Sequence, residues 1–361
     1  MADQKPLVLV TGSSGLIGSA VCERLSQKYL VVGMDRPGLP QAPGEATRID
    51  VDLSQDQSVR DALARLREVH GTRVASVVHL AAYYDFAGEP SPLYEQVTVR
   101  GTQRLLTGMR DAFEVEQFIF SSTLLVHAPC EPGQTINEEW PLEPKWEYPQ
   151  SKVRTEELMR REHGNVPIVM LRVAGVYTDR CNSIPIAHQI QRLYEKKMVA
   201  RVFPGSTSHG QPWVHLDDVV EAIWLTVEKR QQLGSELVLL IGEDRTYSYD
   251  ELQHTIARLI HGESFETTQI PKAVAKTGAW LQDKIPGEDP FIKPWMIDMA
   301  DDHYELDITR ARQTIGWQPK HTLRATLPKM IQFLQNDPHE FYSANKLDLP
   351  SDLQKQEAKG V

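Results

Sequence analysis

The segment Thr11–Gly18, TGSSGLIG, constrains the fold more than any other feature of the chain. It follows an apolar run and leads into a segment of helical period. Glycines at these spacings permit a tight turn and a close approach of the backbone to a pyrophosphate, whose charge the N–H groups of the helix start can hold. The segment predicts a dinucleotide-binding turn. Its cofactor-binding residues are Gly12, Ser14, Gly15, Leu16, Ile17 and Gly18.

An acidic residue follows at the end of the second apolar run. Asp35 lies about twenty residues after the glycines, where a carboxylate accepts hydrogen bonds from both ribose hydroxyls and repels a 2′-phosphate. Asp35 therefore favours NAD over NADP, whereas the adjacent Arg36 favours NADP. Asp52 and Leu53 follow the third strand, where they can contact adenine. Position alone is equally consistent with Asp52 capping a loop or the next helix.

Short apolar runs alternate with segments of helical period, which is typical of a parallel sheet covered by helices. The predicted strands are Leu7–Val10, Tyr29–Met34, Val74–His79, Gln117–Phe120 and Ile168–Arg172. The predicted helices are Leu16–Gln27, Asp56–Val69, Tyr94–Ala112 and Ser151–His163. In the helix Tyr94–Ala112, the spacing of Val97, Leu105, Met109 and Ala112 predicts one buried face.

The alternation of apolar runs and helical segments becomes less regular after about residue 175. We expect an α/β fold, a Rossmann-type doubly wound parallel sheet with a smaller C-terminal substrate lobe. Residues 1–174 with about 215–241 form the NAD-binding Rossmann domain in this division. Residues from about 175 to 214 and from about 242 to 335 form the substrate-binding lobe, and 336–361 are a polar C-terminal tail.

Composition excludes several classes of function. The net charge of −10 argues against nucleic acid as a partner. Cys22, Cys130 and Cys181 are widely spaced, so we expect no disulfide framework, no metal site and a cytoplasmic location. No apolar run approaches the roughly 18 residues of a membrane helix, and the N-terminal segment is typical of a strand rather than a signal peptide.

The segment Tyr148–Lys152, YPQSK, places a phenol and an ammonium four residues apart on one helical face. A nearby ammonium lowers the pKa of a tyrosine and favours the phenolate. Tyr148 can then exchange the proton of an alcohol while nicotinamide handles the hydride. Lys152 can also reach the ribose hydroxyls. Hydroxyls that can orient the substrate follow the strand Gln117–Phe120, at Ser121, Ser122 and Thr123.

With these residues the chain resembles the extended short-chain dehydrogenase/reductase family, in particular its NAD-dependent epimerase/dehydratase group. The resemblance covers about residues 6–335. Its motifs are TGSSGLIG (11–18), Asp35, Asp52-Leu53, HLAA (79–82), Gly101-Thr102, FSSTLLVH (120–127), YPQSK (148–152), LRVAGVY (171–177), PWVHLDDVVEAI (212–223) and IGWQP (315–319).

The resemblance implies further roles. Thr123 would orient the substrate alcohol beside Tyr148, Leu80, Ala81 and Ala82 would line the nicotinamide side, and the chain would form a homodimer through two long helices. Three positions depart from the family pattern. Thr98 replaces a helix asparagine, Gly175 an asparagine that contacts nucleotide sugars in many members, and Gln211 an arginine that often holds substrate phosphate. Trp213 and His215 are further candidates to line the pocket, although a lone histidine more often makes a structural hydrogen bond.

Three hypotheses follow for a small-molecule enzyme of this kind. The first is a nucleotide-sugar epimerase or dehydratase that retains its NAD. No acidic residue accompanies Thr123, which disfavours the dehydratase. The second is an NAD(P)-dependent dehydrogenase or reductase of a non-nucleotide alcohol or ketone. The third is a non-catalytic NAD-binding sensor, which the presence of both Tyr148 and Lys152 disfavours.

Overall fold

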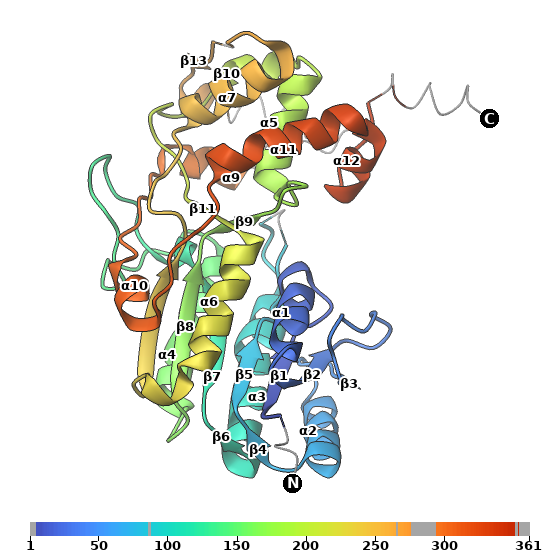
Figure 1. Cartoon of the computed structure of the whole chain (residues 1–361). Coiled ribbons are helices and arrows are strands. Elements are labelled where there is room, and N and C mark those ends of the chain that lie inside the picture. The colour runs from blue at the N-terminus through green and yellow to red at the C-terminus, as the bar shows by residue number, and fades with distance from the viewer. Residues whose placement is uncertain (1–4, 86–87, 265, 276–293, 351–352, 354–361) are drawn as a thin grey trace, which may run out of the picture.

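A seven-stranded parallel sheet forms the centre of the protein (Figure 1). The computed structural model describes residues 5–85, 88–264, 266–275, 294–350 and 353. The strand order is β12-β8-β7-β5-β1-β2-β3, so the direction of winding reverses between β1 and β5. The predicted Rossmann-type fold is confirmed. The strands are β1 (Leu7–Thr11), β2 (Leu30–Asp35), β3 (Thr47–Asp50), β5 (Ser76–His79), β7 (Phe118–Thr123), β8 (Ile168–Val173) and β12 (Glu236–Ile241).

Helices cover both faces of the sheet. Helices α1 (Leu16–Ser26), α6 (Leu216–Glu228) and α10 (Thr309–Ile315) pack on one face, and α2 (Asp56–His70), α3 (Arg100–Ala112) and α4 (Glu147–Glu162) on the other. In β1, Val8 and Val10 face the first core, and Leu7 and Leu9 the second. Because successive side chains of a strand point to opposite faces, a strand buried on both faces is continuously apolar.

A third hydrophobic core lies beyond the carboxyl ends of the strands, at the top of Figure 1. Its helices are α5 (Ile184–Tyr194), α7 (Tyr249–His261), α11 (Leu323–Asn336) and α12 (Pro338–Ala344). Short parallel strand pairs accompany it: β9 (Gly175–Tyr177) with β11 (Trp213–His215), and β10 (Val202–Phe203) with β13 (Thr268–Gln269). Helix α12 lies within the expected polar tail, and its Phe341 and Tyr342 are fully buried.

Shorter elements complete the described ranges. They are β4 (Arg73–Val74), β6 (Glu114–Val115), the π-helix η1 (Tyr94–Val99), α9 (Pro294–Asp298), and the 3-10 helices η2 (Leu124–Val126), η3 (Met198–Arg201), η4 (Arg230–Gln232) and η5 (Met299–Asp301). None of the helices in these ranges is long and apolar enough to cross a bilayer.

Two helices differ from the sequence prediction at their N-terminal ends. The predicted helix Tyr94–Ala112 begins as η1, whose wider turn shifts the buried face to Thr98 and Val99. Val97 is therefore only half-buried, and Ala112 is exposed. Helix α4 begins at Glu147 rather than Ser151. A proline in its first turn removes no helical hydrogen bond, so Tyr148 and Lys152 both lie in this helix.

Candidate active site

The glycine turn lies at the point where the direction of winding reverses. Gly12 has a φ of +69°, and a Cβ on it would lie 2.9 Å from the backbone N of Ala81. A Cβ on Gly18 would lie 2.1 Å from the carbonyl oxygen of Gly12. Gly15 is the N-cap residue of helix α1, and no side chain caps this helix start. The turn is therefore closed too tightly for larger residues, and its helix start has N–H groups that no side chain caps, as pyrophosphate binding requires.

The carboxylate of Asp35 is held toward this turn. It accepts hydrogen bonds from the N–H of Ser14 at 3.0 Å and of Arg36 at 2.8 Å. Arg36 is exposed, whereas Arg48 on β3 lies over the turn and donates to Ser14 Oγ at 2.7 Å and to the Pro40 carbonyl at 2.9 Å. Arg48 was missed from the sequence, because a single arginine in a short strand carries no motif.

The other expected cofactor residues are near the same edge of the sheet. Asp52 Oδ1 accepts hydrogen bonds from the N–H and the hydroxyl of Ser54, at 2.9 and 2.7 Å, so Asp52 caps the turn that follows β3. Leu53 is buried against Gly101 of α3. Leu80, Ala81 and Ala82 follow β5 and are half-buried.

His79, at the end of β5, is fixed between two hydroxyls. Its Nδ1 lies 2.6 Å from Thr11 Oγ1, and its Nε2 lies 2.8 Å from Thr102 Oγ1. Burial lowers the pKa of His79 to about 3, and the charge of Lys152 contributes to this lowering. A neutral His79 thus connects β1, β5 and α3 and positions the segment that begins at Leu80.

Thr123 and Tyr148 meet at the same edge. Thr123 ends β7 and is buried, and its side chain lies close enough to the Tyr148 phenol to lower the pKa of that phenol. Burial raises the pKa of Tyr148 to about 12, and the neighbouring Thr123 side chain offsets only part of this rise. The expected lowering of the phenol pKa is therefore wrong, because burial is the largest influence on this pKa and raises it.

Lys152 lies near the Tyr148 phenol and is almost fully buried. Its Nζ donates to the Ser121 carbonyl at 2.7 Å and lies 5.7 Å from the centre of the Tyr148 ring. Burial lowers the pKa of Lys152 to about 7, and the negative charge of Glu156 opposes this effect. The ammonium is thus directed to β7 rather than to the phenol oxygen.

Aromatic side chains surround Tyr148. The half-exposed Tyr84 ring packs edge-on against it with a centroid distance of 4.9 Å, and the Trp146 ring lies 5.4 Å away. Tyr83 follows the HLAA segment, and its N–H donates to Thr98 Oγ1 at 3.0 Å. Thr98, in place of the family asparagine, thus holds the segment that carries Tyr84. Sequence reasoning missed Tyr84. The available signal was the pair of aromatic residues, Tyr83 and Tyr84, directly after HLAA.

The two substrate-side departures have structural counterparts. A Cβ on Gly175 would lie 2.5 Å from Cε3 of Trp213, its register partner on β11, so the indole occupies the space of a side chain at this position. Gln211 Nε2 donates to the Asp302 carbonyl at 3.3 Å. An apolar ring and an amide engaged with the backbone therefore stand where polar contacts to nucleotide sugars are usual.

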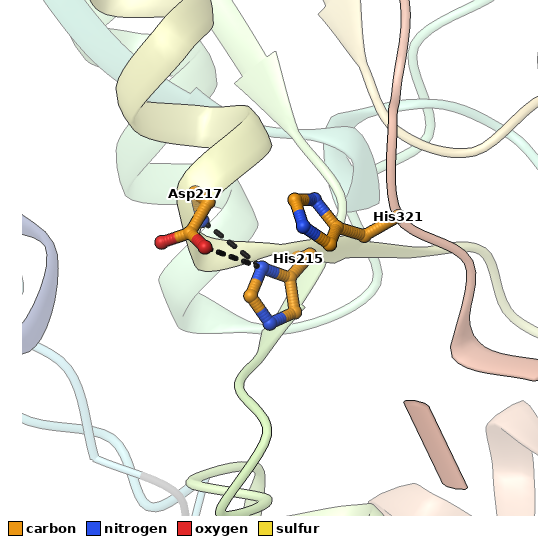
Figure 2. A group of neighbouring side chains, drawn as sticks. All are labelled: His215, Asp217 and His321. Carbon is orange, nitrogen blue, oxygen red and sulfur yellow. Dashed lines mark hydrogen bonds and ion pairs between the residues drawn. The ribbon is translucent and has the colours of Figure 1, made fainter. Parts of the chain in front are cut away.

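His215 caps helix α6, since its Nδ1 accepts from the N–H of Asp217 at 3.2 Å. Figure 2 shows His215, Asp217 and His321, the one group in the described residues that could gather around a metal ion. The two imidazoles are stacked, with centroids 4.3 Å apart and an angle of 27° between their planes. Ring stacking and the capping of α6 are structural roles that these side chains fill.

A sequence profile described as "NAD dependent epimerase/dehydratase family" matches residues 8–242, well over half of the chain. The chain therefore belongs to this family and is an NAD-dependent enzyme. The glycine turn fits the cofactor. A Cβ on Gly12 or Gly18 would collide with neighbouring backbone atoms, so only glycine allows the tight turn that brings the backbone close to a pyrophosphate.

Similar proteins include enzymes with different substrates. The chain is 23% identical to the 3 beta-hydroxysteroid dehydrogenase type 7 of Mus musculus, over 91% of this chain and 95% of that protein. It is 27% identical to a UDP-glucose 4-epimerase of Azospirillum brasilense, over 89% of this chain and 90% of that protein. The structure of the Thermus thermophilus UDP-glucose 4-epimerase in complex with NAD matches with a TM-score of 0.65 and 23% identity, over 91% of this chain and 99% of that one. This last likeness shows the fold.

Proposed function

We propose that the chain is a sugar epimerase-like enzyme, which transfers a hydride between NAD and a secondary alcohol carbon of a sugar, with a nucleotide sugar as the first candidate substrate. The observation that carries this proposal is the meeting of three side chains at the carboxyl edge of the sheet: Thr123 at the end of β7, the Tyr148 phenol, and Lys152, whose Nζ lies 5.7 Å from the centre of the phenol ring. Two hydroxyls placed together at this edge can hold the oxygen of an alcohol or a ketone and exchange its proton.

The proposed cofactor site extends along the same edge. The backbone from Gly12 to Gly18 would hold the pyrophosphate and Asp35 the adenosine ribose, while the segment from Leu80 to Ala82 would line the nicotinamide side. Lys152 would contact the nicotinamide ribose. When bound, NAD supplies the hydride acceptor and, in its oxidised form, a positive charge.

Tyr148 is the proposed proton donor and acceptor. Because burial holds its pKa at about 12, the phenol is protonated at neutral pH and can donate to the oxygen of a ketone. In the oxidative direction it must lose its proton, and the ammonium of Lys152 favours the phenolate. Thr123 orients the reacting oxygen toward Tyr148.

Replacing Tyr148 by phenylalanine tests this assignment. We expect Tyr148→Phe to lose turnover by about 10²–10⁴-fold and to keep NAD affinity within a few-fold, because the phenol serves proton transfer only. Lys152→Ala should lower both turnover and NAD affinity. Turnover of UDP- and dTDP-sugars and of secondary alcohols is measured together with calorimetric NAD binding. Tyr194→Phe, on α5, is the matched control. Activity of Tyr148→Phe within a few-fold of wild type would refute the mechanism.

A second candidate function is a dehydrogenase or reductase of a non-nucleotide alcohol or ketone. The packing of Trp213 against Gly175 favours it, together with Gln211 in place of a cation. A hydrogen bond to a charged group contributes about 1.5–3 kcal/mol, so the missing arginine alone would weaken diphosphate binding by about 10–100-fold. One of the similar proteins, the 3 beta-hydroxysteroid dehydrogenase type 7, is named for a steroid substrate and not for a nucleotide sugar.

Free UDP separates the two candidates. The second candidate, with its reduced diphosphate contacts, predicts that saturating UDP raises the melting temperature little and that common UDP- and dTDP-sugars bind weakly. A rise of several degrees, roughly what 1–2 kcal/mol of ligand binding gives, would instead support a nucleotide-sugar substrate. No response to UDP, combined with reduction of NAD by secondary alcohols, would support the dehydrogenase.

We also propose a homodimer through α3 and α4 and a cytoplasmic location. The two helices lie together, with Gln103 Nε2 donating to Glu162 and Arg110 Nη1 to the Glu162 carbonyl. Light scattering of the purified protein tests the dimer. The three cysteines are unpaired and buried, which supports a reducing compartment.

A further inference from the structure

A buried polar network adjoins the Tyr148 and Lys152 pair through the end of β7 and the next turn of α4. Its side chains are Ser122 on β7, Glu156 on α4, Arg172 on β8 and His127 after η2, and none is more than 2% exposed. Ser122 separates Ser121, whose carbonyl accepts the hydrogen bond from Lys152, from Thr123. The network therefore contacts the segment of β7 that carries the reacting groups.

Glu156 is the centre of this network. Its Oε1 accepts from Ser122 Oγ at 2.6 Å and from Arg172 Nε at 3.0 Å, and its Oε2 accepts from Arg172 Nη2 at 2.6 Å. The bidentate pair and the hydroxyl hold the pKa of Glu156 below its usual range despite burial. The carboxylate is therefore ionised at neutral pH.

The remaining donor of Arg172 is also satisfied. Its Nη1 donates to His127 Nε2 and to the Glu138 carbonyl, both at 3.0 Å. Since Nε2 accepts, the proton of His127 is on Nδ1, which lies 3.0 Å from the Trp140 carbonyl. Burial and the arginine lower the pKa of His127 to about 4, so the histidine is neutral. The fully buried charges of the network are those of Glu156 and Arg172, and the partly exposed Arg160 on α4 also donates to Glu156 Oε2 at 3.5 Å.

Glu156 lies one helical turn after Lys152, on the same face of α4. The groups that face Lys152 are Tyr148 and Glu156 on its own helix, the neutral His79 on β5, and the Ser121 carbonyl and Phe120 ring on β7. Arg172 on β8 and Arg160 on α4 both pair with Glu156. Glu156 is thus the acidic side chain that acts on this buried ammonium.

We propose that Glu156 is a positioning residue for the active site, which keeps the ammonium of Lys152 charged in its buried place and ties α4 to β7 through Ser122. This inference rests on the proposed role of Lys152 beside Tyr148. A salt bridge that served stability alone would not require the carboxylate to lie one turn from the lysine, nor to bond to the residue before Thr123.

The titration of Lys152 tests this inference without a substrate. Lysine is labelled with ¹³C at Cε, its signal is assigned with Lys152→Arg, and its pKa is measured by NMR in the full chain. We expect Glu156→Gln to lower the pKa of Lys152 by about one unit or more, since a charge at the spacing of one helical turn acts strongly in a buried site. Glu157→Gln, the next and exposed residue of α4, should leave it unchanged.

Two further variants separate charge from folding. Ser122→Ala removes a hydrogen bond but no charge, so the pKa of Lys152 should stay near the wild-type value. If Glu156→Gln does not fold because Arg172 is left unpaired, the double variant Glu156→Gln and Arg172→Gln removes both charges. The pKa of Lys152 should still fall there, because Glu156 is the charge that acts on it. An unchanged pKa in the folded variant would overturn the inference. Failure of the proposed function would appear separately, as an active Tyr148→Phe.

Discussion

Replacing Gly18 by alanine measures how much the cofactor site depends on the close contact between α1 and the glycine turn. The added Cβ would lie 2.1 Å from the Gly12 carbonyl oxygen and 2.8 Å from the Ser13 Cα. Both neighbours are backbone atoms, so neither can rotate away. Helix and turn must separate by about 1 Å, the gap that restores an ordinary contact distance.

The energies of this change partly oppose one another. Overpacking costs about 1–3 kcal/mol, and the better helix propensity of alanine returns about 1 kcal/mol. Stability should therefore fall by no more than about 2 kcal/mol, and the variant should remain folded. The larger effect concerns the cofactor. Losing one N–H contact to the pyrophosphate, worth about 1.5–3 kcal/mol, weakens NAD binding by about 10–100-fold.

Calorimetric titration with NAD and thermal unfolding of the same samples measure the two effects. Gly234→Ala is the matched control, because the nearest atom to an added Cβ at this glycine is 3.8 Å away. The control should bind NAD like the wild type. A folded Gly18→Ala protein that bound NAD within threefold of the wild type would show that the tight turn is not what forms the site.

The remaining predictions concern cofactor choice and pH. NAD should bind more tightly than NADP. Asp35→Ser should narrow the difference between the two affinities, because the carboxylate that repels a 2′-phosphate is removed. Tighter binding of NADP than of NAD to the wild type in the same titration would refute this prediction and would point to Arg36 and Arg48. Glu243 is buried against the Leu323 N–H and the Tyr177 hydroxyl, and burial raises its pKa to about 7. The native state therefore binds the proton more tightly than the unfolded chain, and the stability from this group is lost as the pH rises from about 4.5 to 7. Glu243→Gln, which resembles the protonated form, should be more stable than the wild type at pH 8, by at most about 3 kcal/mol, and nearly equal at pH 4. Equal unfolding free energies at pH 8 would contradict the assignment.

Local patterns in the sequence were sufficient for the Rossmann fold and for the elements that carry the expected site. Apolar runs separated by helical segments define strands buried on both faces, and the glycines of Thr11–Gly18 permit a tight turn in which a Cβ on Gly12 or Gly18 would meet backbone atoms. The spacing of Tyr148 and Lys152 places them on one helical face wherever the helix begins. These features depend on residues close together in the chain, so periodicity and backbone sterics decide them without any knowledge of distant contacts.

Only the tertiary structure decided the surroundings of those residues. The π-helix that buries Thr98, the edge-on packing of Tyr84 against Tyr148 and the packing of Trp213 against Gly175 all bear on the site, and the last two join segments far apart in the chain. The sign of the change in the Tyr148 pKa depends on burial, which no spacing reports. The same is true of Glu156, whose partners come from β7 and β8. A side chain's pKa and role depend on the atoms that fold around it, and long-range packing alone determines which atoms those are.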